Sequence, residues 1–122
     1  MNTFEDLEAW KSARELRKAI SKLVKTFPKY ERFRLVDQII RSSRSLPANI
    51  SEGFGRFHFQ ENIQFCRQAR GSLSETLEHL ICALDEEYID KATFQSHREL
   101  IEHCWKVLNG YIAYLKKAVK TK

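Results

Sequence analysis

The chain has 122 residues, of which 30% are charged and 43% hydrophobic, and its formal net charge is +5 at pH 7. This length predicts one domain, residues 1–122, with a single core, and four glycines and two prolines are too few for the turns of a β-sandwich or barrel. No apolar run is long enough to cross a membrane. The acidic start lacks the apolar segment of a secretory signal, so we expect a cytoplasmic protein that makes no membrane contact.

The charge is unevenly spread. Residues 60–90 carry two basic and seven acidic side chains, whereas 1–30, 31–59 and 91–122 are each net basic. Such asymmetry is compatible with a surface that faces nucleic acid. It is equally compatible with an acidic segment that pairs with basic neighbours, either inside the fold or between subunits.

Apolar residues recur every three or four positions in four segments, which predicts four amphipathic helices. We expect these helices at about 5–27, 31–56, 60–87 and 91–119. Thr3 with Asp6 forms a candidate cap for the first helix, and Asp90 is a candidate cap for the fourth. Short connections make successive helices antiparallel neighbours. The predicted fold is therefore all-α, an antiparallel up-down-up-down four-helix bundle.

Two residues interrupt the expected helices. Pro47 lies within the second, where a proline removes one hydrogen-bond donor and displaces a carbonyl. Because the apolar spacing continues in phase through Ile50 and Phe54, we expect the second helix to be kinked at Pro47. Gly71 lies within the third helix at a cost of about 1 kcal/mol relative to alanine. We expect another backbone to approach closely at that level.

A second, polar row follows the second helix beside its apolar stripe. Lysine is absent from it, and its central members are short side chains that form hydrogen bonds. Glu52 and Arg56 have the spacing of a helical ion pair. This row, which we call the polar seam, is expected to be an assembly or partner surface, with an ordinary solvated face as the alternative. Its members are Gln38, Ser42, Ser45, Asn49, Glu52 and Arg56.

Basic residues suggest where a nucleic acid would bind. Every basic residue of the second segment is an arginine, and the guanidinium group matches phosphate geometry. Arginines are also common between packed helices, so the pattern alone does not decide. The nucleic-acid-binding candidates are Arg41, Arg44, Lys116, Lys117 and Lys120.

Other chemistries lack their sequence patterns. The four histidines form neither an HExxH motif nor the paired Glu-x-x-His of di-iron bundles. Three widely spaced cysteines fit reduced core residues better than disulfides or a zinc knuckle. No phosphate-binding glycine loop or nucleophile elbow is present. We therefore expect no cofactor, no metal site and no catalytic residue, although a groove enzyme using Asn49, Glu52 and Arg56 is a minor alternative.

Several motifs resemble a known family over nearly the whole chain. They are Phe4-x-Asp6-Leu7-x-Ala9-Trp10, Phe27-Pro28 followed by Glu31, Gln38 through Arg41, Leu46-Pro47-Ala48-Asn49-Ile50-Ser51-Glu52-Gly53 with Gly55-Arg56, and Gly71-Ser72-Leu73 with Glu75. Together they resemble the four-helix-bundle proteins encoded in intervening sequences of bacterial 23S rRNA genes. That family is similar to the accessory variability proteins of diversity-generating retroelements. The most specific motif residues are Pro47, Ala48, Asn49, Glu52, Gly53, Gly55 and Arg56.

This resemblance implies a homopentameric, barrel-like assembly without enzymatic activity. It also implies association with RNA, DNA or a nucleic-acid enzyme as the role to test; ribosome association would follow only from the location of the gene, which by itself shows no binding. The alternative is an oligomeric protein-interaction module with no nucleic-acid role. One departure stands out, because Phe57-His58-Phe59 replaces the small hydroxyl residue that caps the third helix in the family.

Overall fold

The computed structural model describes residues 3–121, and within that range it contains four α-helices and no strand. The helices are α1 (Glu8–Leu23), α2 (Leu35–Gly55), α3 (Phe59–Asp85) and α4 (Lys91–Lys120). Short 3₁₀ turns, Phe4–Asp6, Val24–Thr26 and Lys29–Glu31, flank α1 and precede α2. The prediction of an all-helical fold with four long helices is confirmed.

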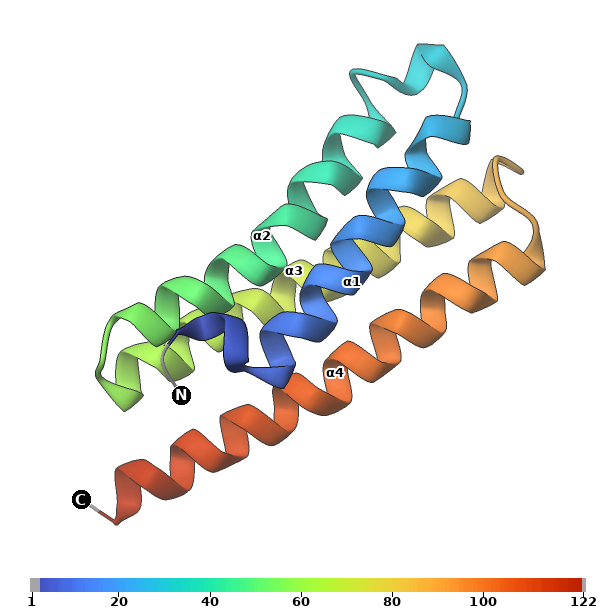
Figure 1. The fold of residues 1–122 in the computed structure, drawn as a ribbon. Helices are drawn as coiled ribbons and strands as arrows, with labels where there is room; N and C mark the ends of the chain where they lie inside the picture. The colour runs from blue at the N-terminus through green and yellow to red at the C-terminus, as the bar shows by residue number, and fades with distance from the viewer. Residues whose placement is uncertain (1–2, 122) are drawn as a thin grey trace.

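Each helix packs on two others. α1 contacts α2 and α4, and α3 contacts the same two helices from the other side. Figure 1 shows the chain passing back and forth along the long axis, with α3 behind α1. Leucine and isoleucine from all four helices fill the centre, as the periodicity predicts. The fully buried large aliphatic side chains include Leu16, Ile20, Ile39, Leu46, Ile50, Leu73, Leu80, Ile101, Leu108 and Leu115.

α1 is shorter than the predicted 5–27. Thr3 and Asp6 do form a reciprocal capping box, but it closes the 3₁₀ turn Phe4–Asp6. Leu7 then adopts an extended conformation (ψ 127°), so α1 starts at Glu8. At the other end, Val24–Thr26 tightens into a 3₁₀ turn before Phe27 becomes extended ahead of Pro28, as expected for a residue that precedes proline.

α2 begins four residues later than predicted. Lys29–Glu31 form a 3₁₀ turn, and Arg34 has a non-helical backbone (ψ −105°). Glu31 Oε1 lies 3.5 Å from the amide nitrogen of Leu35 and so accepts from the first residue of the helix. Arg32 and Arg34 therefore precede α2, so the arginines of the second segment do not all lie on one helix.

At each end of α3, the capping position is occupied by a residue type that is uncommon there. His58 is its N-cap residue and makes no side-chain hydrogen bond to the helix, so the cap absent from the sequence is also absent from the structure. At the C-terminus, Glu87 N–H donates to Leu84 O (3.0 Å) and Tyr88 N–H to Ala83 O (2.9 Å). This is a Schellman motif with Glu87 at the left-handed position (φ 62°), which glycine usually occupies.

Gly71 and Gly53 differ in how closely other parts of the chain approach them. A Cβ added to Gly71 would meet nothing within 4 Å, so the expected close approach of another backbone at this level is wrong. The close approach is instead at Gly53 in α2, where an added Cβ would lie 2.7 Å from Asn62 Oδ1 and 2.9 Å from Phe65 Cβ. Pro47 lies inside α2 and is buried.

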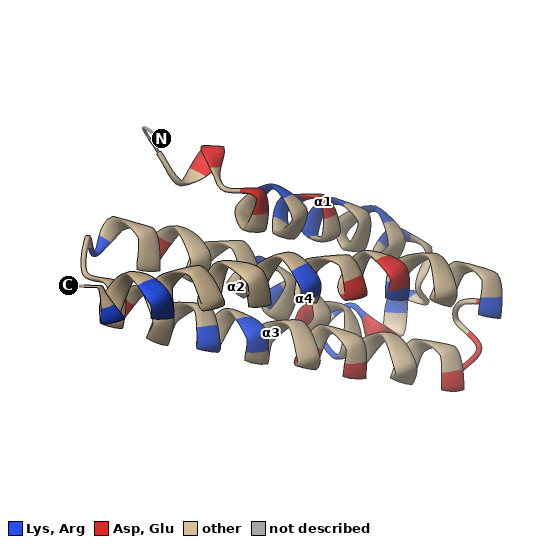
Figure 2. Ribbon diagram, turned by 90° about the horizontal axis from the view of Figure 1, so that it is seen from below, with Lys and Arg blue, Asp and Glu red and all other residues tan. Residues whose placement is uncertain are grey.

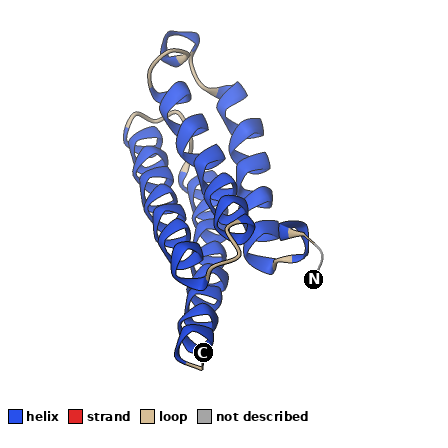
Figure 3. Cartoon of the chain, turned by 90° about the vertical axis from the view of Figure 1, so that its left-hand side faces the viewer, coloured by secondary structure: helices blue, strands red, loops and turns tan. Residues whose placement is uncertain are grey.

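α4 is the longest helix, and its C-terminal turns extend past the other helices (Figures 1 and 3). As predicted, the Asp90 side chain caps its start, accepting from the Thr93 amide at 2.7 Å. This bond lowers the pKa of the Asp90 carboxyl. No described helix combines the length and hydropathy needed to span a membrane.

Candidate nucleic-acid interface

The centre of the polar seam lies between α2 and α3 within one chain. Ser42 is buried, and its Oγ lies 2.8 Å from Thr76 Oγ1. One turn on, Ser72 Oγ donates to Ser45 Oγ at 2.9 Å. Such short hydroxyl side chains let the two helices approach closely while satisfying each polar group. This part of the seam is therefore an internal helix contact.

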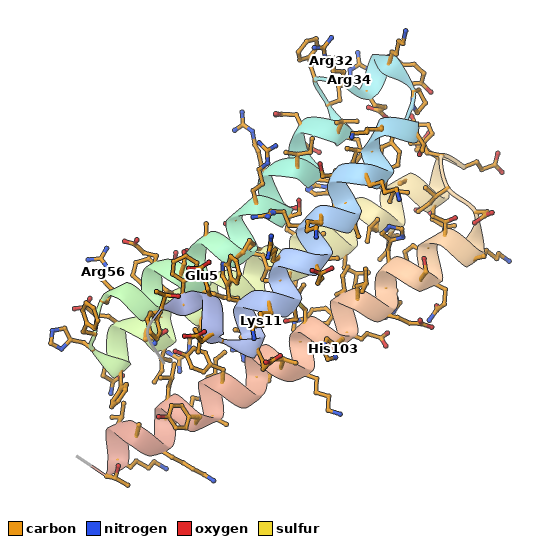
Figure 4. All side chains as sticks on the ribbon, in the orientation of Figure 1. Glu5, Lys11, Arg32, Arg34, Arg56 and His103 are labelled. Carbon is orange, nitrogen blue, oxygen red and sulfur yellow. The ribbon has the colours of Figure 1, made fainter. Side chains whose placement is uncertain are left out.

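The rest of the seam varies in exposure. Asn49 Nδ2 donates to Ser45 O (2.9 Å) and Ser45 Oγ (3.0 Å), which holds its amide against its own helix. Arg56 pairs with Glu52 at 2.9 Å, as the spacing predicts. The Arg56 guanidinium also lies 5.1 Å from the centre of the Phe65 ring, so it connects the end of α2 to α3 (labelled in Figure 4). Gln38, Glu52 and Arg56 are exposed.

Gly53 and Asn62 fix the closest part of this contact. Asn62 is buried, and its Nδ2 donates to Tyr111 OH of α4 at 2.9 Å. Burial raises the pKa of Tyr111, so the phenol stays protonated at neutral pH, which suits its pairing with the amide. The seam side of the motif therefore links α2, α3 and α4.

The opposite side of the same motif borders a groove between α1 and α2. This α1–α2 groove has a volume of about 530 Å³. Its apolar walls are Phe4, Trp10, Pro47 and Ala48. Its polar groups are Arg17, Arg44 and Ser51. The motif thus has two uses: one side packs against α3, and the other forms the wall of a basic groove.

Two contacts hold the aromatic wall of the groove in place. Phe4 meets Trp10 edge to face, with ring centres 5.1 Å apart. The Arg14 guanidinium lies over the Trp10 ring, 5.7 Å from its centre, so Trp10 is held by a second contact from its own helix. The 3₁₀ turn Phe4–Asp6 therefore has a clear role, because it folds Phe4 back onto α1.

The arginines differ in their partners. Arg41 Nε lies 3.1 Å from Asp37 Oδ2, so a carboxylate already neutralises it. Among residues 3–121, Arg17 and Arg44 form no ion pair. Two arginines from different helices, neither of them in an ion pair within residues 3–121, thus line one groove. That arrangement suits an anion with several oxygens, such as a phosphate.

The other predicted basic residues lie elsewhere. Lys116, Lys117 and Lys120 are exposed on the C-terminal turns of α4, which is not a packing neighbour of α2. Figure 4 places Arg32 and Arg34 at the opposite end of the molecule from Arg56. The structure therefore does not bring Arg41 and Arg44 together with the C-terminal lysines.

The acidic segment does not pair with its basic neighbours. Each ion pair in the described part of the chain joins residues three or four apart on one helix or its cap. Figure 2 shows basic residues in the first half of α3 and acidic residues toward its end. The expectation that the acidic segment pairs with basic residues of its own chain is therefore wrong for residues 3–121. Pairing between subunits stays a prediction.

The cysteines and histidines form no reactive cluster. Burial raises the pKa of the Cys66 thiol to about 11 and also raises that of Cys104. No group of three or more His, Cys, Asp or Glu side chains within residues 3–121 is placed to hold a metal ion.

The sequence alone does not identify Arg17, and Trp10 and Ser51 enter there only as parts of family motifs and not as residues of a groove. Trp10 and Arg17 are seven residues apart, two turns of one helix face, so the spacing could have paired them. Which helix would face them could not be read from the chain.

Comparison with known proteins supports the resemblance noted in the sequence. A family model described as "23S rRNA-intervening sequence protein" matches residues 5–110, which include the whole seam and every groove residue except Phe4. No individual curated protein matches the chain.

Proposed function

Because the chain belongs to the 23S rRNA-intervening sequence protein family, we propose that it is a non-enzymatic, cytoplasmic, homo-oligomeric scaffold that associates with nucleic acid. The observation that carries this proposal is that Arg17 and Arg44, which form no ion pair within residues 3–121, both line the α1–α2 groove. The net charge of +5 supports it, because a basic protein attracts phosphate at long range. The C-terminal lysines would add a second, sequence-independent contact.

A gel-shift titration at low salt tests this role. The probes are a structured RNA hairpin and a DNA duplex, each with the purified full chain. Binding through phosphates releases counterions, so affinity should fall by orders of magnitude between about 50 and 200 mM salt if several phosphates are contacted. Absence of a shifted band with both probes at 50 mM salt would contradict the proposal.

The assembly is a homopentamer in this proposal, as the resemblance implies. The exposed acidic end of α3 supports an assembly, because its carboxylates have no basic partner within residues 3–121 and could face a basic surface of another copy. Light scattering after size exclusion should give a mass five times the 14.4 kDa of one chain. A mass of one chain at high protein concentration would overturn this part.

We further propose that the subunit is an up-down-up-down bundle whose α2 bends at Pro47. Proline leaves the carbonyl four residues earlier, that of Ser43, without its helical donor. A bend would carry the second half of α2 along α3 toward Asn62, where Gly53 permits contact. Replacing Pro47 with alanine and determining the crystal structure would test whether α2 straightens.

One observation favours the alternative of an oligomeric protein-interaction module. Phe57 and Tyr114 are 83% and 61% exposed and line a second cavity of about 710 Å³ between the start of α1 and α4. Exposed aromatic side chains beside a cavity are typical of protein contacts. An oligomer that forms but binds neither RNA nor DNA at low salt would favour this alternative.

A further inference from the structure

We infer that the α1–α2 groove holds an unpaired nucleotide of a single-stranded nucleic acid, an inference that rests on the proposed nucleic-acid function. The groove combines two features that a purely electrostatic surface lacks. It is concave, with a volume of about 530 Å³, and four of its wall residues are apolar. Both features fit a ligand that enters the protein.

The charged part of the groove matches the phosphate of such a nucleotide. Arg17 comes from α1 and Arg44 from α2, so an anion between the helices could be bound from both sides. Neither guanidinium has an acidic partner within residues 3–121, so an incoming phosphate would displace no ion pair. Arg41, held by Asp37, is the contrasting case on the same helix.

The apolar part matches the base. Single-stranded nucleic acids offer unstacked bases, which pack on aromatic rings and on the planes of arginine guanidinium groups. Phe4 and Trp10, whose rings meet edge to face, supply the aromatic wall. Ala48 lines the groove with a single methyl group, so its side chain takes up little of the groove volume.

A duplex would leave these apolar walls without a partner. Its bases remain in the stack, and its outer surface offers mainly phosphates and sugars. Duplex binding would therefore use the arginines and not the walls. The structure thus assigns the groove a preference for single strands over duplexes, which general attraction to phosphate does not predict.

Fluorescence anisotropy with labelled 12-nucleotide probes tests this preference. The probes are oligo(U) RNA, oligo(dT) DNA, and the 12-base-pair duplexes of each with its complement, all at one salt concentration. We expect each single strand to bind at least tenfold more tightly than its duplex. The ratio between the RNA and DNA single strands then identifies the preferred sugar, and either order agrees with the inference.

A groove-filling variant separates the walls from the charges. Ala48 is exposed, so Ala48→Gln should fold and fill the groove without changing the net charge. We expect Ala48→Gln to weaken the binding of single strands and so to lose the preference for single strands over duplexes. Ala113→Gln, the same change at an exposed position of α4, should behave as wild type. Circular dichroism confirms that both variants fold.

The results that would contradict the inference alone differ from those that would also contradict the proposed function. Equal affinity of wild type for single strands and duplexes, or an unchanged preference in Ala48→Gln, would overturn the inference and leave the nucleic-acid function standing. Absence of binding to all four probes at low salt would overturn the proposed function and the inference together.

Discussion

Ser42 Oγ and Thr76 Oγ1 lie 2.8 Å apart in the buried contact between α2 and α3. Ser42 Oγ also lies 3.2 Å from Ile39 O, and Thr76 Oγ1 lies 2.9 Å from Ser72 O, so one hydroxyl donates to the other while the second donates to its own helix. A polar pair at the centre of a bundle is therefore fully satisfied. It allows small side chains at a contact where leucines would hold the helices further apart.

This pair makes a prediction for stability. Thr76→Val keeps the shape of the side chain but removes the hydroxyl that pairs with Ser42, which retains only the Ile39 carbonyl, so it should lower the free energy of unfolding by about 1 kcal/mol. Adding Ser42→Ala should cost less than the sum of the two single changes, because both polar partners are then absent. Urea denaturation measures both. Ser74→Ala, exposed on the same helix, should stay within about 0.5 kcal/mol of wild type.

Gly53 and Gly71 should respond to alanine in opposite directions. In Gly53→Ala the new Cβ meets Asn62 and Phe65 below 3.0 Å, so α2 and α3 must separate, at a cost of about 1–3 kcal/mol. Gly71→Ala enters open space in a helix and should stabilise by about 0.5–1 kcal/mol. Thermal unfolding ranks the two variants and wild type. Equal midpoints for all three would show that the contact at Gly53 is not as close as described.

Glu87 should be better replaced by glycine. It occupies the left-handed position of the Schellman motif with φ 62°, which costs a non-glycine residue roughly 1–2 kcal/mol. Glu87→Gly should therefore raise the unfolding midpoint. The neighbouring Glu86 has φ −81°, so Glu86→Gly relieves no strain and should not raise it. A lower midpoint for Glu87→Gly than for Glu86→Gly would contradict this account.

The thiols should differ in reactivity. Burial raises the pKa of Cys66 to about 11 and also that of Cys104, so both stay protonated and shielded at pH 8. Cys82 is less buried; its pKa is raised by partial burial and by Glu86, so its reaction should speed up as the pH rises toward 10. Ellman's reagent should label Cys82 first in the native chain. Persistence of the fast phase in Cys82→Ser would contradict this order.

The two kinds of arginine should differ in their salt dependence. Arg44→Ala removes an unpaired cation from the groove, so the slope of log affinity against log salt should become shallower by about 0.7 for a single strand. Arg17→Ala should behave in the same way. Arg41→Ala removes a cation already paired with Asp37 and should change the slope less. Anisotropy titrations at four salt concentrations measure these slopes. An equal change in all three variants would remove the distinction.

The periodicity of apolar residues was enough to predict four helices and their inward faces. The ends were less predictable, because they depend on single backbone conformations, such as extended Leu7 before α1 and Arg34 before α2. The expectation at Gly71 was wrong for a related reason. A glycine within a helix indicates a close contact only when another element lies against it, and none lies within 4 Å of a Cβ added to Gly71.

The candidate site, like the fold, could be predicted only in part from the sequence. The polar seam could be found within α2, because all its members share one helix face. Its neighbour could not be identified, because Ser72 and Thr76 approach from a helix about 30 residues away in sequence. The groove needed Arg17 and Arg44 to be brought together by the packing of α1 on α2. Two residues on different helices form no periodic pattern in the sequence, so their spacing could not reveal that they line one groove.

The two-sided motif of α2 has a consequence for reading related sequences. Ser42, Ser45 and Gly53 are constrained by contact with α3, whereas Ala48 and Ser51 border the groove. A relative can therefore keep the first set, and with it the contact between α2 and α3, while the residues of the second set change. Presence of the motif in a new genome therefore reports shared ancestry of the scaffold. We expect the positions equivalent to Arg17, Arg44 and Ala48 to decide whether a relative shares the binding proposed for the groove.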